Sequence, residues 1–407
     1  MASPTDPPPF PACRHRRRRA ATSSGRLTWL AGEPFRLFFP AGLLWSLVGV
    51  LLWPLFYAGE LTFHPGIAHA RLMIQGFGGA LVLGFLGTAG PRMASAPKWT
   101  SQELLTLFLL HSTGCLLHLR LQHAAGDLAF LLALAGLTTG LLVRVARFRR
   151  EWPPPQLLLA LTGLGCGLVG TLLWLTPDPA ASLPRQRLAS LLVYQGLLLP
   201  PVLGIGSFLF PRLLGGGFGE TGADIRPRLQ RALLASALLV ASFILEAWDH
   251  ARLGPLLRAG TATWYLLIEI RWRRAPGDAP RGSLTTGLFW ALGLGLTGLL
   301  LMALLPERRL AVGHLLYAGG FGLLMLVVAS RVVFGHSGEL DGFAQRGWRP
   351  RLLLFLAVLA TLTRATADFF PAILISHHLY AAWTWAAAAL FWLLWQRRRL
   401  GQRDSTD

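Results

Sequence analysis

Histidines at the ends of apolar segments are the residues of this sequence best suited to chemistry. His69 lies in the stretch FHPGIAHARLMIQGFGG, and His314 and the pair His377-His378 begin later apolar runs. Ionisable groups inside a membrane segment are costly and therefore indicate function. Neutral imidazole is the commonest metal ligand and an axial ligand of haem iron. The pattern predicts one buried metal or haem site, with His69, His314 and His377 or His378 as ligands. The alternative is that each histidine only packs.

A second set of potential ligands occurs in the run HSTGCLLH. His111, Cys115 and His118 are spaced by four and seven residues, so they share one face of a helix. Two ligands one turn apart can chelate a metal. The alternative, which we favour, is a polar stripe against a neighbouring helix, with Cys115 acting as a small apolar residue.

Three further residues are candidates for contact with a cofactor. Arg71 follows His69 by two positions, and we expect it either to neutralise a haem propionate or to extend to the outer headgroups. Arg331 lies deeper in an apolar run and needs an anionic partner, for which a propionate would serve. His336 follows it in the run RVVFGHSG and is either part of the same region or structural.

The elements that would position these residues are membrane helices. Of the 407 residues, 53% are hydrophobic and only 14% are charged, which is too apolar for an ordinary soluble protein. The net charge is +19, and 37 of the 38 basic residues are arginines. They lie in short clusters between apolar runs, as in membrane loops, which argues against nucleic acid as a partner and for the lipid bilayer.

Twelve apolar runs approach the length of about 20 residues that a spanning helix needs. The sequence therefore predicts an all-α fold, a polytopic transmembrane bundle of about twelve helices, with no evident internal repeat. We expect Pro371 and Ser376-His377-His378 to mark the turn between the last two. The runs are 35–58, 66–90, 103–119, 124–143, 156–176, 188–210, 229–247, 251–270, 284–305, 310–334, 351–375 and 376–395.

The basic residues also predict the domain layout and orientation. We expect a disordered basic tail over 1–30, a transmembrane domain over 31–396 and a cytoplasmic tail over 397–407. With the N-terminus inside, the inner segments hold 26 basic residues and the outer segments six. This bias predicts a multi-pass membrane protein with both termini in the cytoplasm. It places the candidate ligand histidines at the outer face.

Several stretches resemble one family, the NnrS proteins. They are Pro34-Phe35-Arg36-Leu-Phe-Phe39, the run from His69 through Met73-Ile-Gln-Gly76-Phe77 to Gly84-Phe85-Leu86-Gly87-Thr88, and the run from His314 through Ser330-Arg331-Val332 to Gly335-His336-Ser337-Gly338. NnrS proteins are polytopic bacterial membrane proteins described as containing haem and copper and linked to nitric oxide and nitrosative stress. The resemblance implies a haem-bearing membrane protein of this response.

The chain departs from the family pattern at one place. His69 matches the first histidine of the family's His-x-His-Glu-Met pattern, but Arg71 replaces the second histidine and Leu72 the glutamate. Arginine stays protonated and cannot bind a metal. The resemblance therefore implies haem as a cofactor and makes copper doubtful. His314, Arg331 and His336 keep the family pattern.

The hypothesis that follows is an inner-membrane haem protein of the nitric oxide response. Nitric oxide is small, uncharged and soluble in lipid, so it could reach a haem buried among helices. Whether the protein is an enzyme stays open. One alternative is a transporter of a small solute or metal complex, which would favour helices broken at Pro200-Pro201 or Pro255. The other is a non-catalytic membrane scaffold.

Overall fold

A computed structural model describes residues 29–177, 182–213, 225–269, 282–339 and 347–402. Side chains are described over these ranges except at 211–213. Within them, every regular element is helical and no strand occurs. The predicted all-α fold is confirmed. The predicted tail over 1–30 lies outside these ranges as far as residue 28, and so do residues 403–407 of the C-terminal tail.

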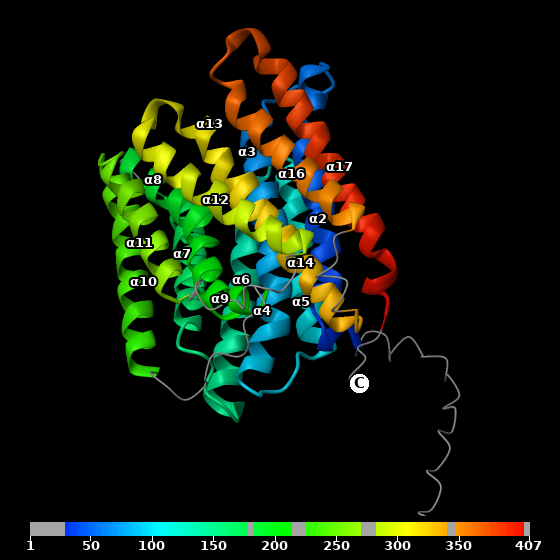
Figure 1. Ribbon diagram of the computed structural model, residues 1–407, viewed down its shortest axis with the longest axis vertical. Coiled ribbons are helices and arrows are strands. Elements are labelled where there is room, and N and C mark those ends of the chain that lie inside the picture. Colours follow the sequence, from blue (N-terminus) through cyan, green and yellow to red (C-terminus); the bar gives the residue numbers. More distant parts are fainter. Residues whose placement is uncertain (1–28, 178–181, 214–224, 270–281, 340–346, 403–407) are drawn as a thin grey trace, which may run out of the picture.

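Each predicted apolar run coincides with one helix or one continuous series of helices (Figure 1). Nine of these, within the described residues, are long and apolar enough to cross a membrane; α5, α11 and α17 are the other three. The elements are α2 (Phe35–Tyr57), α3–η1–α4 (Gly66–Arg71, Leu72–Gly78, Gly79–Met93), α5 (Ser101–Leu119), α6 (His123–Phe148), α7 (Leu157–Leu175), α8–η2–α9 (Leu183–Leu191, Leu192–Gly196, Leu199–Leu213), α10 (Ile225–Ala247), α11 (Leu253–Glu269), α12 (Ser283–Leu304), α13–η5–α14 (Arg309–His314, Leu315–Gly322, Leu323–His336), α16 (Trp348–Ala367) and α17 (Leu374–Leu400).

The boundary between the last two helices differs from the prediction. Helix α16 ends at Ala367, and a short 3₁₀ turn at Pro371–Ile373 leads into α17. Ser376 and His377 therefore lie inside the first turn of α17 rather than in a loop. Their side chains donate to the carbonyl of Ile373, at 2.9 and 3.1 Å. These local bonds satisfy the two polar side chains within the first turn of the helix.

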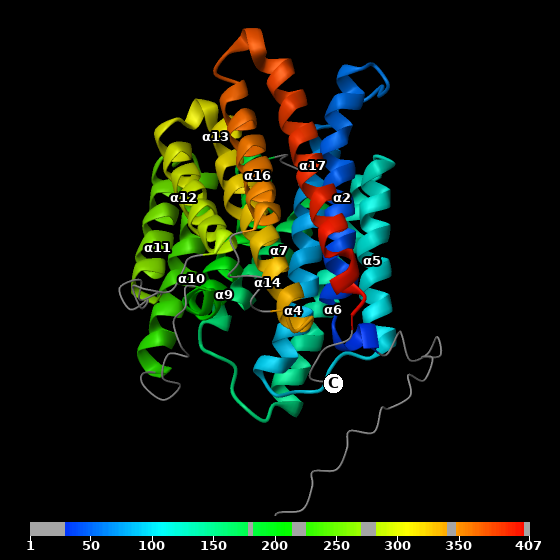
Figure 2. The ribbon, with the colours of Figure 1, turned by 45° about the vertical axis from the view of Figure 1, so that its right-hand side comes forward.

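The helices form three similar units of four, a repeat that the sequence did not reveal. The units are α2 to α6, α7 to α11 and α12 to α17. The last helix of each unit packs against the first helix of the next, as α6 against α7 and α11 against α12. Helix α17 packs against α2 and closes the ring, as Figures 1 and 2 both show.

The second member of every unit contains a π-helical segment, η1, η2 or η5. The first helix of each unit approaches that segment closely through a glycine. A Cβ on Gly49 would lie 3.1 Å from Leu72, one on Gly170 2.8 Å from Leu192, and one on Gly298 2.6 Å from the backbone of Leu316. π-segments are rare in proteins, but those that occur are often at functional sites. Their wider turn frees a backbone carbonyl and redirects side chains.

The start of α2 and the end of α17 lie on the same side of the bundle. The buried Arg36 near the start of α2 donates to the carbonyls of Arg399 and Leu400 at the end of α17, at 3.0 and 3.1 Å. This agrees with an even number of crossings. We refer to the opposite end of the bundle, where α2 ends, as the outer end.

Candidate functional site

Three clusters of polar side chains lie between neighbouring units, each in the outer half of the bundle. The Arg71 cluster joins the first unit to the second and contains Arg71, Gln75, His118, Asp127 and Tyr194. The Arg258 cluster joins the second to the third and contains Gln195, Glu246, Arg258, Arg309 and Tyr317. The histidine cluster joins the third to the first and contains Tyr57, His69, His314, Arg364, Asp368 and His378.

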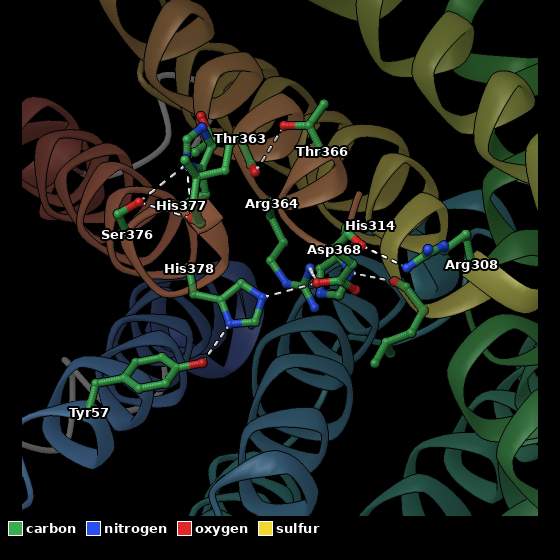
Figure 3. Close-up of polar contacts among 12 residues, drawn as sticks. Tyr57, Arg308, His314, Thr363, Arg364, Thr366, Asp368, Ser376, His377 and His378 are labelled. Atoms are coloured by element: carbon green, nitrogen blue, oxygen red, sulfur yellow. Dashed lines mark hydrogen bonds and ion pairs between the residues drawn. The ribbon is translucent and has the colours of Figure 1, made fainter. Parts of the chain in front are cut away.

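A hydrogen-bonded chain forms one wall of the histidine cluster. Arg364 pairs with Asp368 at 3.0 Å, as their spacing predicts for one turn of helix. The same carboxylate lies 3.2 Å from His378 Nε2, and His378 Nδ1 lies 2.8 Å from the Tyr57 hydroxyl (Figure 3). The carboxylate accepts, so Nε2 carries a proton; in neutral His378, Nδ1 then accepts from Tyr57. Both nitrogens of His378 are occupied.

The other two histidines of this cluster, unlike His378, are held by bonds to main-chain carbonyls. His69 Nδ1 donates to the carbonyl of Gly49 at 2.9 Å, and His314 Nδ1 donates to the carbonyl of Leu310 at 2.8 Å. These bonds fix the neutral tautomer that leaves Nε2 with a lone pair. Neither Nε2 has a hydrogen-bond partner among the described residues, and both side chains keep some accessible surface. Both lie within electrostatic range of Arg364.

His377 is separate from this cluster. It bonds the carbonyl of Ile373, and its ring contacts Tyr380. Figure 3 shows it on the other side of α17 from His378. Consecutive helical residues point about 100° apart, so His377 and His378 cannot both face one pocket. The structure brings together His69, His314 and His378 and leaves out His377.

Arg71 faces the neighbouring junction rather than the histidines. Its Nε lies 2.8 Å from Asp127 Oδ1, and its Nη2 donates to Oδ2 at 3.1 Å. Its Nη1 donates to the Tyr194 hydroxyl at 2.7 Å, and its guanidinium lies 3.3 Å from the centre of the Trp174 ring. The residue is only 7% exposed, so it does not extend to the surface. Its charge is already balanced by Asp127.

The stripe of His111, Cys115 and His118 packs on the π-segment η1. His111 Nε2 donates to the carbonyls of Gln75 and Gly76, at 3.1 and 3.0 Å. A π-segment leaves a carbonyl without its helical partner, and His111 supplies one. His118 Nε2 bonds the Gln75 side chain at 2.8 Å, and the Cys115 sulfur lies against Gly76. The favoured alternative, a polar stripe facing a neighbouring helix, describes this arrangement.

Arg331 and His336 lie toward the inner end of the same helical run that carries His314. Twenty-two residues of helix separate His314 from His336, or about 33 Å along the axis. His336 Nε2 lies 2.7 Å from Arg92 Nη1, and its ring packs 4.6 Å from that of Phe35. The structure therefore does not bring these two residues to the outer histidines.

Sequence reasoning missed one buried charge in each of the other two junctions, Asp127 and Arg258. Asp127 is 3% exposed and Arg258 is fully buried. Arg258 pairs with Glu246 at 2.7 Å and donates to the Gln195 side chain at 2.6 Å. Gln195 in turn donates to the Tyr317 hydroxyl at 3.0 Å. Both charges stand inside predicted spans, at 124–143 and 251–270, and that signal was sufficient to find them.

The fold and these clusters define a class of protein, a polytopic helical membrane protein in which polar groups gather between three four-helix units. The model of the family described as NnrS protein matches residues 29–402, nearly the whole chain. The chain therefore belongs to the NnrS family, and the resemblance noted in the sequence is confirmed. No curated protein matches it. Membership makes it a membrane protein related to the nitric oxide response.

The side-chain nitrogens available in the histidine cluster determine which metal or cofactor it could hold. Within the described residues, no group of three or more His, Cys, Asp or Glu side chains is arranged to hold a metal ion. Two imidazoles with Nδ1 fixed and Nε2 free suit haem, because histidine is a usual ligand of haem iron. A ring nitrogen bonded to a carbonyl is the usual support of a ligating histidine.

Proposed function

We propose that this protein is a haem-binding protein of the bacterial inner membrane that acts in the nitric oxide response. In this proposal His69 and His314 are the residues that would hold the haem. One observation carries the proposal: two histidines from different units lie in one cluster, each with Nδ1 bonded to a main-chain carbonyl and with no partner for Nε2 among the described residues. The family supplies the link to nitric oxide. Copper is not included, because Arg71 replaces an expected ligand and pairs with Asp127.

The residues around the two ligands have separate roles in this proposal. His69 and His314 bind and orient the group through their rigid rings. Arg364 supplies positive charge beside both imidazoles, which suits the propionates of haem. Asp368, His378 and Tyr57 hold Arg364 and connect it to α2 and α17. When bound, haem would supply one-electron redox chemistry.

The proposed orientation has the arginine-rich end in the cytoplasm. The two described chain ends lie together on that side, and the histidine cluster lies at the opposite end. The cluster would then lie near the periplasmic surface. Nitric oxide enters from either aqueous side or from lipid, since it carries no charge.

Transport is the less supported alternative. Helix α9 does begin at a break, with Pro200 and Pro201 just after a turn at Leu197–Leu198. However, the second member of every unit is interrupted by a π-segment. Irregular backbone is therefore a feature of all three units and does not by itself indicate a transport site. Pro255 lies in the first turn of α11, where proline is tolerated, and breaks no helix.

The test is the visible spectrum of the full-length protein purified after expression with a haem supply. We expect a haem absorption band in the wild type and its loss in His69→Ala and in His314→Ala. His123→Ala is the matched control, because His123 lies at the start of a spanning helix but belongs to another junction. A wild type without haem, or single variants that keep a wild-type spectrum, would overturn the proposal.

A further inference from the structure

An apolar pocket lies in the inner half of the bundle, where α4, α9 and α14, from the second members of the three units, meet. Its empty volume is about 590 Å³ including the mouth. The pocket opens at the surface of the bundle, and its interior has room for a ligand of a few heavy atoms. Its lining is apolar throughout and includes Phe39, Val82, Val202, Ile205, Met325 and Val328.

The pocket continues the same helical runs that carry the histidine cluster. Val82 follows His69 by 13 residues, and Met325 follows His314 by 11 residues. At 1.5 Å per residue, the pocket lies about 15–20 Å inward of the two imidazoles along these helices. Val202, Ile205, Met325 and Val328 are only partly buried, because they face this space rather than a neighbouring helix.

We infer that this pocket is a binding place for a small, uncharged, apolar molecule, the class that includes nitric oxide. A ligand there receives no hydrogen bond, because no polar side chain lines the space. A charged or amphiphilic molecule would lose its hydration without compensation. Apolar cavities in proteins stay dry and bind xenon or similar molecules. Naming nitric oxide as the natural occupant rests on the proposed function; the pocket and its ligand class do not.

The probe for the pocket is xenon, and the measurement is anomalous diffraction from xenon-pressurised crystals of the full-length protein. We expect a xenon peak between Val82, Val202 and Val328 in the wild type. Val202→Phe and Val328→Phe place a ring in the space from two different helices and remove the peak. Leu233→Phe, on the lipid-facing side of α10 at 51% exposure, keeps it. No peak in the wild type, or a peak that survives both filling variants, would overturn the inference.

A second measurement separates this inference from the proposed function. With haem-loaded protein, we expect nitric oxide to change the haem spectrum more slowly in Val202→Phe and Val328→Phe than in Leu233→Phe. Equal rates would show that nitric oxide reaches the haem without passing through this pocket, and would overturn nitric oxide as its natural occupant. If the protein binds no haem but xenon occupies the pocket, the proposed function fails and the apolar site stands.

Discussion

The Arg258 cluster and the histidine cluster occupy equivalent junctions of the bundle, yet they differ in how far their polar groups are satisfied. Arg258 and Glu246 have side chains 0% and 1% exposed, and each bonds several partners. In the histidine cluster, Arg364 and Asp368 are 16% and 23% exposed, and two imidazole nitrogens have no hydrogen-bond partner in the part of the chain that the structure describes. In the first junction, which we call closed, ion pairs satisfy the polar groups, while in the second, the open junction, two imidazole nitrogens keep a lone pair that could bind a metal ion.

This difference indicates how a repeated fold can restrict function to one junction. Glu246 pairs with Arg258 of its own unit and with Arg309 of the third unit, so separating the two units leaves an uncompensated charge in a medium of low dielectric. Free imidazoles add little to that arrangement. The Arg71 cluster belongs with the closed type, since Asp127 pairs with Arg71 through both oxygens.

The largest expected effect comes from breaking the closed junction. Glu246→Leu alone should destabilise the protein by about 3–5 kcal/mol, because Arg258 is left charged and buried. The double variant Glu246→Leu with Arg258→Leu should recover most of that loss. Thermal unfolding in detergent measures both, and Asp249→Asn is the control, because it removes the charge of the exposed pair with Arg187 and keeps a residue that tolerates the positive φ of 68° at this position. A single variant as stable as the wild type would contradict the comparison.

Arg71→His asks whether the family's second histidine can be restored. The new imidazole would face Asp127 and Tyr194 rather than His69. We therefore expect no gain of copper, and a loss of stability of about 1–3 kcal/mol from the uncompensated partner. Metal analysis and thermal unfolding measure the two effects. Stoichiometric copper in this variant would show that Arg71 and His69 share one site after all.

Asp368→Asn should act on the open junction mainly through charge. The partly exposed pair contributes about 0.2–1 kcal/mol, so unfolding should hardly change. Removing the carboxylate leaves the Arg364 charge unbalanced beside His69 and His314. In the haem-loaded protein, we expect a higher midpoint potential, because a nearby positive charge favours the reduced iron. A potential equal to that of the wild type would separate Arg364 from the cofactor.

The smallest effect is expected at His377. His377→Ala removes only a bond to the carbonyl of Ile373 and a ring contact, so the spectrum and the unfolding temperature should stay near those of the wild type. His378→Ala is its neighbour for comparison, and it should alter the spectrum because it removes the support of Asp368. Loss of the haem band in His377→Ala would contradict the assignment of these two residues.

Much of the fold was determined by the sequence alone, because hydrophobic transfer acts on each segment separately. Twelve apolar runs gave the helices, and the spacing of Arg364 and Asp368 gave an ion pair within one helix. The short motifs around His69 and His314 gave the family. His69 and His314 were also identified as candidates, since an imidazole in an apolar segment is visible without coordinates.

Only the tertiary structure decided which side chains meet. Helix register and the π-segments turn Arg71 toward Asp127 and His69 toward Gly49, although the two residues are separated by one position. The repeat of three units has only a short trace in the sequence, Gln75-Gly76 and Gln195-Gly196 in two of the π-segments, and its recognition depends on packing and backbone geometry. Contacts such as that between His378 and Tyr57 join residues 321 positions apart, and no local pattern encodes them.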